Sequence, residues 1–355
     1  MTVQRGIGYA IASAVLFGLS TPLAKTLVGV VSPLLLAGLL YAGSGVGLLA
    51  ALGVRRLVAG RSSTIVLPHS RDWLWLAAAI LCGGIIAPVA LMFGLASTPA
   101  STASLLLNLE AVFTAVLAWF LLRENFDHRI AAGMLAIVAG GVVLAWTPTG
   151  RAGFPGGSLL IAAACLGWAL DNNLTRRVSV ADAVMVAGMK GIVAAIVNLG
   201  LALFVLRLPL PAIADVTAAM TVGFFGYGVS LVLFVLALRH LGSARTGAYF
   251  SIAPFVGAVV AIAWQGEALT WRLLVAGVLM ALGVWLHLTE RHEHLHVHEQ
   301  QEHTHAHVHD EHHQHIHDFG GDGREPHTHR HVHSPLVHSH PHFPDVHHRH
   351  RHDHE

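Results

Sequence analysis

The sequence predicts an all-α polytopic membrane protein with ten transmembrane helices in two inverted five-helix repeats, followed by a disordered histidine-rich tail. Of the 355 residues, 54% are hydrophobic and 12% are charged, whereas a soluble domain carries about 25% charged residues. Apolar runs fill most of the chain from Gly6 to Leu288, and about 20 apolar residues suffice for a helix to cross the hydrocarbon core. Of the 28 histidines, 24 follow Arg291.

Each apolar run is expected to form one helix, because the backbone N–H and C=O groups of a membrane segment must be paired within the protein. Strands of membrane barrels are shorter and alternate apolar with polar residues. These runs are longer and lack that alternation. We expect the ten spans at residues 7–27, 33–54, 73–95, 100–122, 129–147, 157–176, 183–206, 216–238, 244–264 and 271–289.

Lys and Arg residues in the connections predict the orientation. More of them lie at one set of helix ends, where the connection 55–72 contributes Arg55, Arg56, Arg61 and Arg71. Because short cytoplasmic loops are enriched in Lys and Arg, we expect the N-terminus to be cytoplasmic. An even number of spans places the tail on the same side. The expected location is the inner (plasma) membrane, so the lipid bilayer is one expected partner.

Two stretches indicate an internal repeat. "TAVLAWFLLRENFDHR" (114–129) and "GAVVAIAWQGEALTWR" (257–272) align without a gap, so that Glu124 recurs as Glu267 after a shift of 143 residues. Five spans per half make the second half enter the membrane from the opposite side, which is a common transporter architecture with its site between the halves. The chain therefore divides into a first repeat, a second repeat and the tail: 1–147, 148–290 and 291–355.

The same stretches resemble a known family. "NLEAVFTAVLAWFLLREN" (108–125) and "SIAPFVGAVVAIAWQGEALT" (251–270) are similar to the two repeat signatures of EamA-type transporters of the drug/metabolite transporter superfamily, and the resemblance covers about residues 5–290. It implies ten helices, an inverted repeat, a central cavity and secondary active transport of small organic solutes, often outward. One departure is Ala111, where the family often has Pro and where the second half keeps Pro254.

Two acidic residues close the fourth and ninth spans in this pattern. We interpret Glu124 and Glu267 as folding or gating elements, satisfied by a hydrogen bond at a helix terminus or in a loop. We assign the same structural or gating role to Pro22 and Pro254, which interrupt the first and ninth spans.

A carboxylate near the middle of the fourth span is the first candidate site residue. An ionisable group in hydrocarbon costs a few kcal/mol, so its presence needs a reason. Glu110 can accept a proton or bind a cation, or it can bond a neighbouring helix as part of the structure. Asn108 lies two residues earlier and therefore on a different face of a helix.

Three consecutive polar residues, Asp171, Asn172 and Asn173, interrupt the sixth span. Ser20 and Pro22 interrupt the first span at equivalent depth. Paired interruptions in corresponding spans indicate a binding site, although a helix-end cap by Asp171 is an alternative.

Three further side chains complete the candidate site. Lys190, within the seventh span, can bind an anionic substrate or form an ion pair with Asp171 or Asp182. Trp168 and Tyr249 can line a cavity, although aromatic residues in spans also serve packing and interfacial belts.

The tail is expected to be disordered, because it lacks the apolar periodicity that a core requires. Neutral imidazole binds Zn, Ni, Co and Cu, and in an extended chain residues i and i+2 share a side. Because several metals bind imidazole and the tail lacks regular zinc-finger spacing, the sequence does not select one metal. The candidate ligands are His292, His294, His296, His298, His303, His305, His307, His309, His312, His313, His315, His317, His327, His329, His331 and His333.

These observations predict a secondary active transporter, acting as an exporter of small organic metabolites or toxic solutes, with a cytosolic metal-binding or sensing tail. The alternative is a divalent metal exporter that uses the tail to collect Ni, Co or Zn. No enzyme is expected, because the sequence offers no nucleophile with a base and no phosphate loop. A formal net charge of +1 argues against nucleic acid as a partner. We expect a small-molecule substrate, no cofactor for transport, and a monomer or homodimer.

Overall fold

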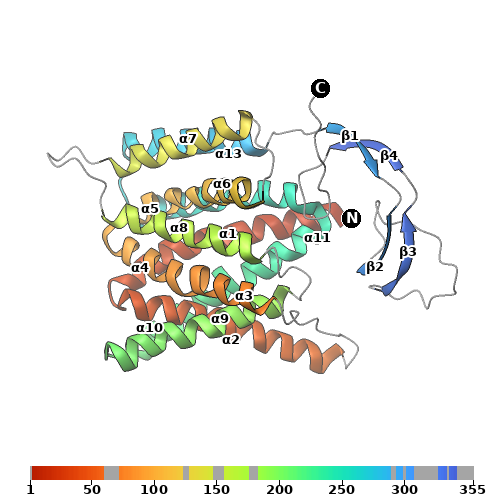
Figure 1. The fold of residues 1–355 in the computed structure, drawn as a ribbon. Coiled ribbons are helices and arrows are strands. Elements are labelled where there is room, and N and C mark those ends of the chain that lie inside the picture. The colour runs from red at the N-terminus through yellow and green to blue at the C-terminus, as the bar shows by residue number, and fades with distance from the viewer. Residues whose placement is uncertain are drawn as a thin grey trace. The chain divides into compact units, whose positions relative to one another are not determined.

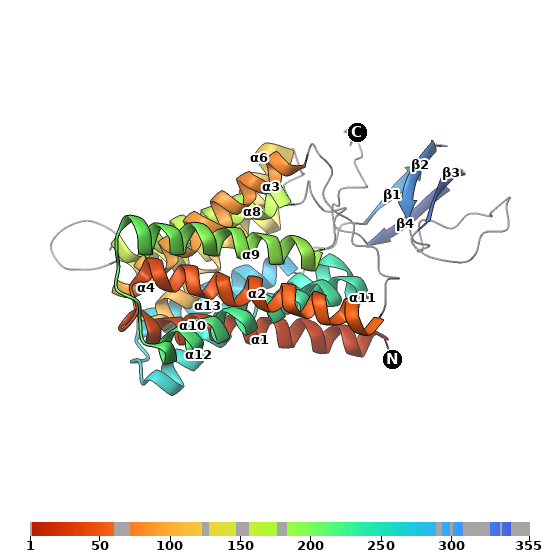
Figure 2. The same cartoon turned by 90° about the horizontal axis from the view of Figure 1, so that it is seen from below.

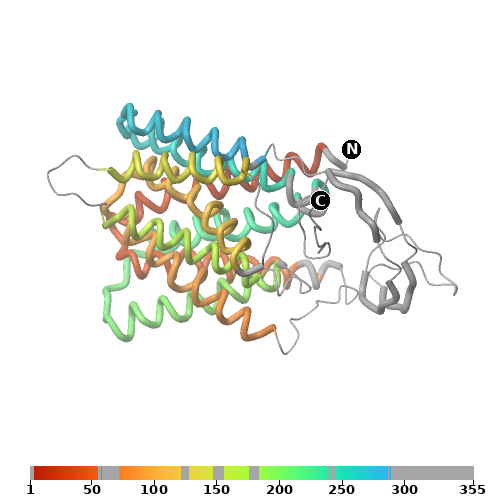
Figure 3. Tube along the Cα trace, turned by 45° about the horizontal axis from the view of Figure 1, so that its top comes forward, coloured from red at the N-terminus to blue at the C-terminus, as the bar shows by residue number. Residues whose placement is uncertain are grey.

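The computed structural model contains a helical unit, Met1–Glu290, and a tail unit, Arg291–Glu355, and each is described by itself (Figure 1). Some connections and most of the tail fall outside the part of the chain that the structure describes. In Figure 3, residues whose placement is uncertain are grey. The structure describes residues 2–59, 72–122, 128–146, 156–175, 183–288, 293–298, 301–307, 327–333 and 336–341.

The first half of the helical unit contains five spans, two of which consist of several helical segments. The third span joins two α-helices through a π-helical segment, and the fourth is interrupted by a turn at residues 107–108. The elements are α1 (Thr2–Val28), α2 (Pro33–Ala59), α3 (Trp73–Ala79), the π-helix η2 (Ile80–Ile86), α4 (Ala87–Ser97), α5 (Ala100–Leu106), α6 (Leu109–Leu122) and α7 (His128–Ala145).

The second half repeats this pattern. Its eighth span again contains a π-helix, and a turn at residues 251–252 again precedes the helix that ends the ninth span. The elements are α8 (Gly156–Thr175), α9 (Ala183–Gly200), η4 (Leu201–Val205), α10 (Ile213–Gly223), η5 (Phe224–Val229), α11 (Ser230–Phe250), α12 (Ala253–Gln265) and α13 (Trp271–Leu288).

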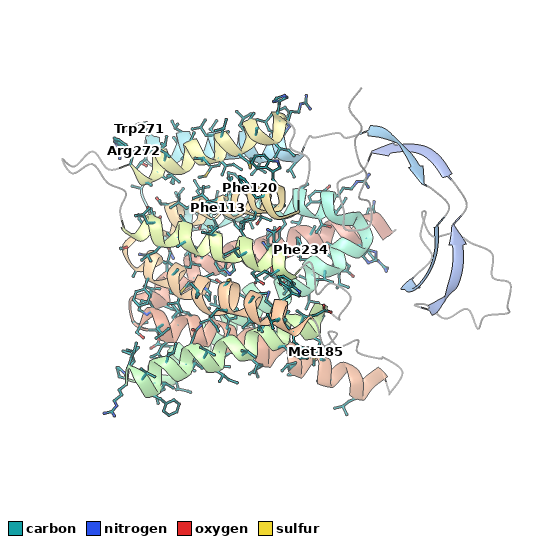
Figure 4. All side chains as sticks on the ribbon, in the orientation of Figure 1. Phe113, Phe120, Met185, Phe234, Trp271 and Arg272 are labelled. Carbon is teal, nitrogen blue, oxygen red and sulfur yellow. The ribbon has the colours of Figure 1, made fainter. Side chains whose placement is uncertain are left out.

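The ten predicted spans correspond to these elements. Eight helical stretches of the described chain are long and apolar enough to cross a bilayer, and Trp271–Leu286 is a shorter apolar helix. The remaining span is the 20-residue α8, whose mean hydropathy is lowered by Asp171, Asn172 and Asn173. The chain is therefore an all-α polytopic membrane protein. Large apolar side chains such as Phe120, which is 67% exposed, cover its outer surface (Figure 4), as expected for contact with lipid.

One connection differs from the expectation. α11 continues as a helix across residues 238–244, where a short loop between the eighth and ninth spans was expected. No proline occurs between Ser230 and Phe250, so the backbone hydrogen bonds of the helix are not interrupted there.

Contacts between α7 and α13, which lie side by side in Figure 1, demonstrate the inverted repeat. A Cβ atom on Gly140 would lie 3.0 Å from the carbonyl oxygen of Ala276, and one on Gly283 would lie 2.5 Å from that of Gly133. A shift of 143 residues converts Gly133 into Ala276 and Gly140 into Gly283. The contact of Gly140 with position 276 and the contact of Gly283 with position 133 are therefore equivalent under the repeat. Such reciprocal contacts are what a two-fold axis between α7 and α13 requires.

Other helices of the two halves also pack on one another in reciprocal pairs. α1 packs on α11 and α12 of the second half, while α8 packs on α4 and α6 of the first half. α2 and α9 also pair along their length (Figure 2). Reciprocal hydrogen bonds join α1 to α11: Ser13 Oγ donates to the Ser230 carbonyl at 2.7 Å, and Ser230 Oγ donates to the Ser13 carbonyl at 2.9 Å.

The tail unit contains two antiparallel pairs of short strands. β1 (Glu293–His298) pairs with β4 (Leu336–Pro341), and β2 (Gln301–His307) pairs with β3 (His327–His333). This pairing differs from the expectation of a tail without regular structure. Its physical reason is the alternation of histidine with other residues, because a period of two suits a strand.

The close approach of α7 and α13 leads to a first prediction. Gly283→Ala should lower the free energy of unfolding by about 1–3 kcal/mol, because its Cβ would overlap the backbone of α7. Thermal unfolding of the purified protein in detergent measures the change. Gly53→Ala is the matched control: it lies within α2 with no heavy atom within 4 Å of a Cβ, so it should be neutral or stabilising by up to about 1 kcal/mol. Equal behaviour of the two variants would contradict the packing argument.

Candidate functional site

A buried ion pair joins α8 to α9. Lys190 Nζ lies 2.5 Å from Asp171 Oδ1, and Asp171 is only 7% exposed. Thr175 Oγ1 donates to the same carboxylate oxygen at 2.8 Å and accepts from Lys190 Nζ at 3.3 Å. Of the two predicted partners of Lys190, the structure selects Asp171, and Asp182 lies outside the described residues. Charges removed from water in this way need each other as partners.

Glu110 adjoins this pair through the next residue of α8. Asn172 Nδ2 donates to Glu110 Oε1 at 2.8 Å. Glu110 occupies the first turn of α6, where the N-terminal end of a helix favours a negative charge. The turn at 107–108 creates this helix start within the span, although Ala111 replaces the proline that marks the equivalent break before α12.

Asn108 satisfies the backbone at the same interruption. Its Nδ2 donates to the carbonyl of Leu105 at 2.9 Å and lies 3.8 Å from Met280 Sδ. Asn108 is 4% exposed. Its described bonds therefore serve the helix break and the contact with α13, whereas Glu110 is bonded to Asn172 of α8.

The π-helix η2 supplies the wall beside Asp171. A Cβ on Gly83 would overlap the Asp171 side chain, so only glycine leaves room for the carboxylate there. The Gly83 carbonyl accepts hydrogen bonds from Tyr41 at 2.9 Å and from Trp168 Nε1 at 3.0 Å. Trp168 is thus fixed next to the ion pair. Tyr41 was not predicted, because a single tyrosine in an apolar run carries no signal of its partner.

The equivalent wall in the second half faces Ser20. A Cβ on Gly226, in η5, would lie 2.6 Å from Ser20 Cβ. The 143-residue shift relates Gly226 to Gly83, so Ser20 and Asp171 occupy corresponding positions of the two halves. Ser20 Oγ donates to the Phe17 carbonyl at 2.6 Å. The ring of Tyr227, the next residue of η5, stacks on Tyr41 at a centroid distance of 5.8 Å. These two rings therefore link the Ser20 side to the Asp171 side.

The other predicted residues occupy the surroundings of the cluster. Asn173 Nδ2 donates to the Ala169 and Thr114 carbonyls at 2.9 and 3.3 Å. Its Oδ1 is buried without a hydrogen-bond partner. Tyr249 is half-buried on α11.

Glu267 holds together one end of the bundle. Its carboxylate accepts from the backbone N–H groups of Ala100 and Ser101 at 2.6 and 2.8 Å, which is the helix-terminus bond expected for it. At the same end, Lys25 Nζ donates to the Leu95 carbonyl at 2.5 Å, and Gln265 Nε2 donates to the Pro22 carbonyl at 2.6 Å. Arg272, labelled in Figure 4, donates to the Trp146 carbonyl at 2.9 Å. Glu124, the counterpart of Glu267, lies outside the described residues.

A small hollow lies between α1, α5 and α12. The buried hydroxyl of Ser104, which has no hydrogen-bond partner, is part of its wall. Its lining consists of Phe17, Gly18, Thr21, Ser104, Leu107, Ala253 and Pro254. Pro254 stands in the first turn of α12, so it marks the helix start that bounds this hollow.

Metal ligation was predicted for the tail. Among the side chains that the structure describes, no group of three or more His, Cys, Asp and Glu lies close enough to hold a metal ion. The predicted ligands in the strands are placed by backbone register alone, and the following lie outside the described residues: His292, His309, His312, His313, His315 and His317.

Comparison with known proteins identifies the family. The model of the EamA-like transporter family matches residues 4–146 and 155–289, one match for each half. The chain belongs to the EamA-like transporter family. Each matched segment lies within one half of the helical unit, and the second ends at residue 289.

Two curated relatives and one solved structure are similar to this chain. An uncharacterized transporter of Methanothermobacter thermautotrophicus is 30% identical over 223 residues, 61% of this chain and 64% of that relative. The match thus spans slightly less than two thirds of that relative. A probable terminal-alkyne amino-acid exporter of Streptantibioticus cattleyicolor is 30% identical over 66% of this chain and 76% of its own. A solved crystal structure shares the fold, with a TM-score of 0.58 at 22% identity, covering 80% of this chain and 94% of that one.

The ion pair leads to a second prediction. Asp171→Asn or Lys190→Met alone should each destabilise the protein by about 3 kcal/mol, because each leaves a buried charge without its partner. The double variant should lose less free energy of unfolding than the sum of the losses of the two single variants. Thermal unfolding of all four proteins in one detergent gives the coupling energy directly. Additive losses would show that the two charges are stabilised independently of each other.

Proposed function

We propose that this EamA-like transporter exports a small organic solute that carries both an ammonium and a carboxylate group. The observation that supports this substrate class is the Asp171–Lys190 pair, which is buried between α8 and α9 beside the π-helix. A zwitterion can replace both partners at once, with its ammonium on Asp171 and its carboxylate on Lys190. The number of paired charges then stays constant, so substrate binding avoids the cost of an unpaired buried charge.

The name of one relative supports the same class. The Streptantibioticus protein is described as a probable amino-acid exporter, and amino acids carry the two charges that the pair would recognise. Uptake or export of other organic solutes would leave Asp171 and Lys190 without opposite charges in the substrate.

Alternating access between the two halves is the proposed mechanism. The excess of Lys and Arg at one set of helix ends supports the proposal that the N-terminus and the tail lie in the cytoplasm and that the membrane is the inner (plasma) membrane. The Glu267 contacts with Ala100 and Ser101 then close the outer end. Glu110, bonded to Asn172 beside the ion pair, is the proposed coupling carboxylate, which takes up a proton when the pair is occupied by substrate.

The tail is proposed to bind a divalent transition metal and to act as a cytosolic buffer or sensor. Imidazole is a preferred ligand of Zn, Ni, Co and Cu, and 24 of the 28 histidines lie there. In the alternative, a metal exporter, the tail would instead collect the cargo.

The decisive experiment measures counterflow in proteoliposomes. Radiolabelled amino acids are tested beside nickel and zinc isotopes, with the full chain, with Asp171→Asn and with a chain ending at Arg291. We expect amino-acid counterflow that falls at least tenfold in Asp171→Asn and persists without the tail.

A matched control and a contrary outcome complete this test. Asp215→Asn removes a carboxylate in the first turn of α10, away from the pair, and should keep most of the counterflow. Metal counterflow that requires the tail, in the absence of amino-acid counterflow, would overturn the organic-solute proposal in favour of the metal exporter.

A further inference from the structure

The register of the tail strands places most of their histidines directly opposite histidines; the exceptions are His298, opposite Leu336, and His333, opposite Gln301. In the β2–β3 ribbon the opposed residues are His303 and His331, His305 and His329, and His307 and His327. In the β1–β4 ribbon they are His294 and His340, and His296 and His338. The alternation of histidine along a single strand does not require this result, because a shift of one residue would oppose each histidine to another residue type.

All six paired histidines of the β2–β3 ribbon share one face. Residues two apart lie on the same face of a strand, and directly opposed residues lie on the same face of the ribbon. The intervening pairs occupy the other face and contain no histidine: Glu302 with Val332, Thr304 with Arg330, and Ala306 with Thr328. The backbone register therefore assigns the paired histidine positions to one face of the ribbon and positions of mixed composition to the other.

The spacing of these positions suits coordination of one ion by several imidazoles. Opposed Cβ atoms in an antiparallel pair lie about 4.5–5.5 Å apart, and successive pairs on one face are separated by about 6.7 Å along the strand. Two neighbouring pairs together offer four nitrogen ligands. Four nitrogens satisfy tetrahedral Zn²⁺ or the square-planar preference of Cu²⁺ and Ni²⁺.

We propose that the cross-strand histidine pairs, and not isolated His-x-His segments, are the metal sites of the tail, and that the ligand is a late first-row divalent cation. The proposal makes specific the metal-binding role proposed for the tail and is independent of the transported solute. An ion held by His303 and His331 connects positions 28 residues apart and closes the chain between them. Metal binding is thereby coupled to strand pairing, since the ligands come together only when the ribbon forms.

Two variants of identical composition separate this proposal from simple histidine content. His303→Gln with His331→Gln removes one complete pair and leaves two neighbouring pairs intact. His303→Gln with His329→Gln also removes two histidines but breaks two pairs and leaves only one. The same strands and the same residue types are changed in both.

Titration calorimetry with Ni²⁺ and Zn²⁺ on the full-length protein in detergent, stripped of metal, measures the outcome. Both variants are made in a chain that also carries His294→Gln and His296→Gln, which break the two opposed histidine pairs of the β1–β4 ribbon. In that background, the variant that lacks only the His303–His331 pair should keep the tightest site. The variant that lacks two pairs should bind its first ion at least tenfold more weakly. Equal affinity and stoichiometry would overturn the proposal and leave binding by histidine density alone. Since no solute flux is measured, failure here is distinct from failure of the export proposal.

Cross-linking tests the register itself. Thr304→Cys with Arg330→Cys places thiols at opposed positions on the face without histidine, whereas Thr304→Cys with Thr328→Cys displaces one of them by two residues. A short bifunctional thiol reagent should join the opposed pair preferentially, and Zn²⁺ should increase its yield. Equal yields for the two variants, with or without metal, would also overturn the proposal.

Discussion

Hydrocarbon offers no hydrogen bonds, so every interruption of a membrane helix must be matched by a partner from elsewhere in the protein. The interruptions of this chain follow that constraint. Tyr41 and Trp168 donate to the carbonyl of Gly83 in η2, Asn108 serves the break between α5 and α6, and Glu267 accepts the N–H groups at the start of α5. Tyr41, Trp168 and Glu267 come from other spans than the groups that they bond, and these contacts therefore fix the relative positions of the helices, whereas the Asn108 bond is local.

Symmetry in the backbone is combined with asymmetry in the charges. The π-helices η2 and η5 and the turns before α6 and α12 recur within one residue of the repeat shift, which is within the accuracy of helix boundaries. The side chains facing the two π-helices differ: Asp171 faces Gly83, and Ser20 faces Gly226. A two-fold scaffold thus carries the Asp171–Lys190 ion pair on one side and the uncharged Ser20 at the corresponding position of the other.

The tail follows a different physical rule from the helical unit. Much of its sequence has a period of two, and its apolar residues are few and scattered. Pairing of strands, and not burial of a core, is therefore the regular structure open to it. The register of β2 with β3 aligns His305 with His329.

The sequence by itself determined the number and length of the spans, the five-plus-five repeat and the list of polar residues at membrane depth, because hydrophobic length and the cost of buried charge act locally along the chain. It could not establish that Asp171 pairs with Lys190, nor find Tyr41, nor show that Asn108 serves a helix break. Those assignments depend on distances between helices, and only the tertiary structure, in which glycines such as Gly83 set how closely two helices approach, decided them.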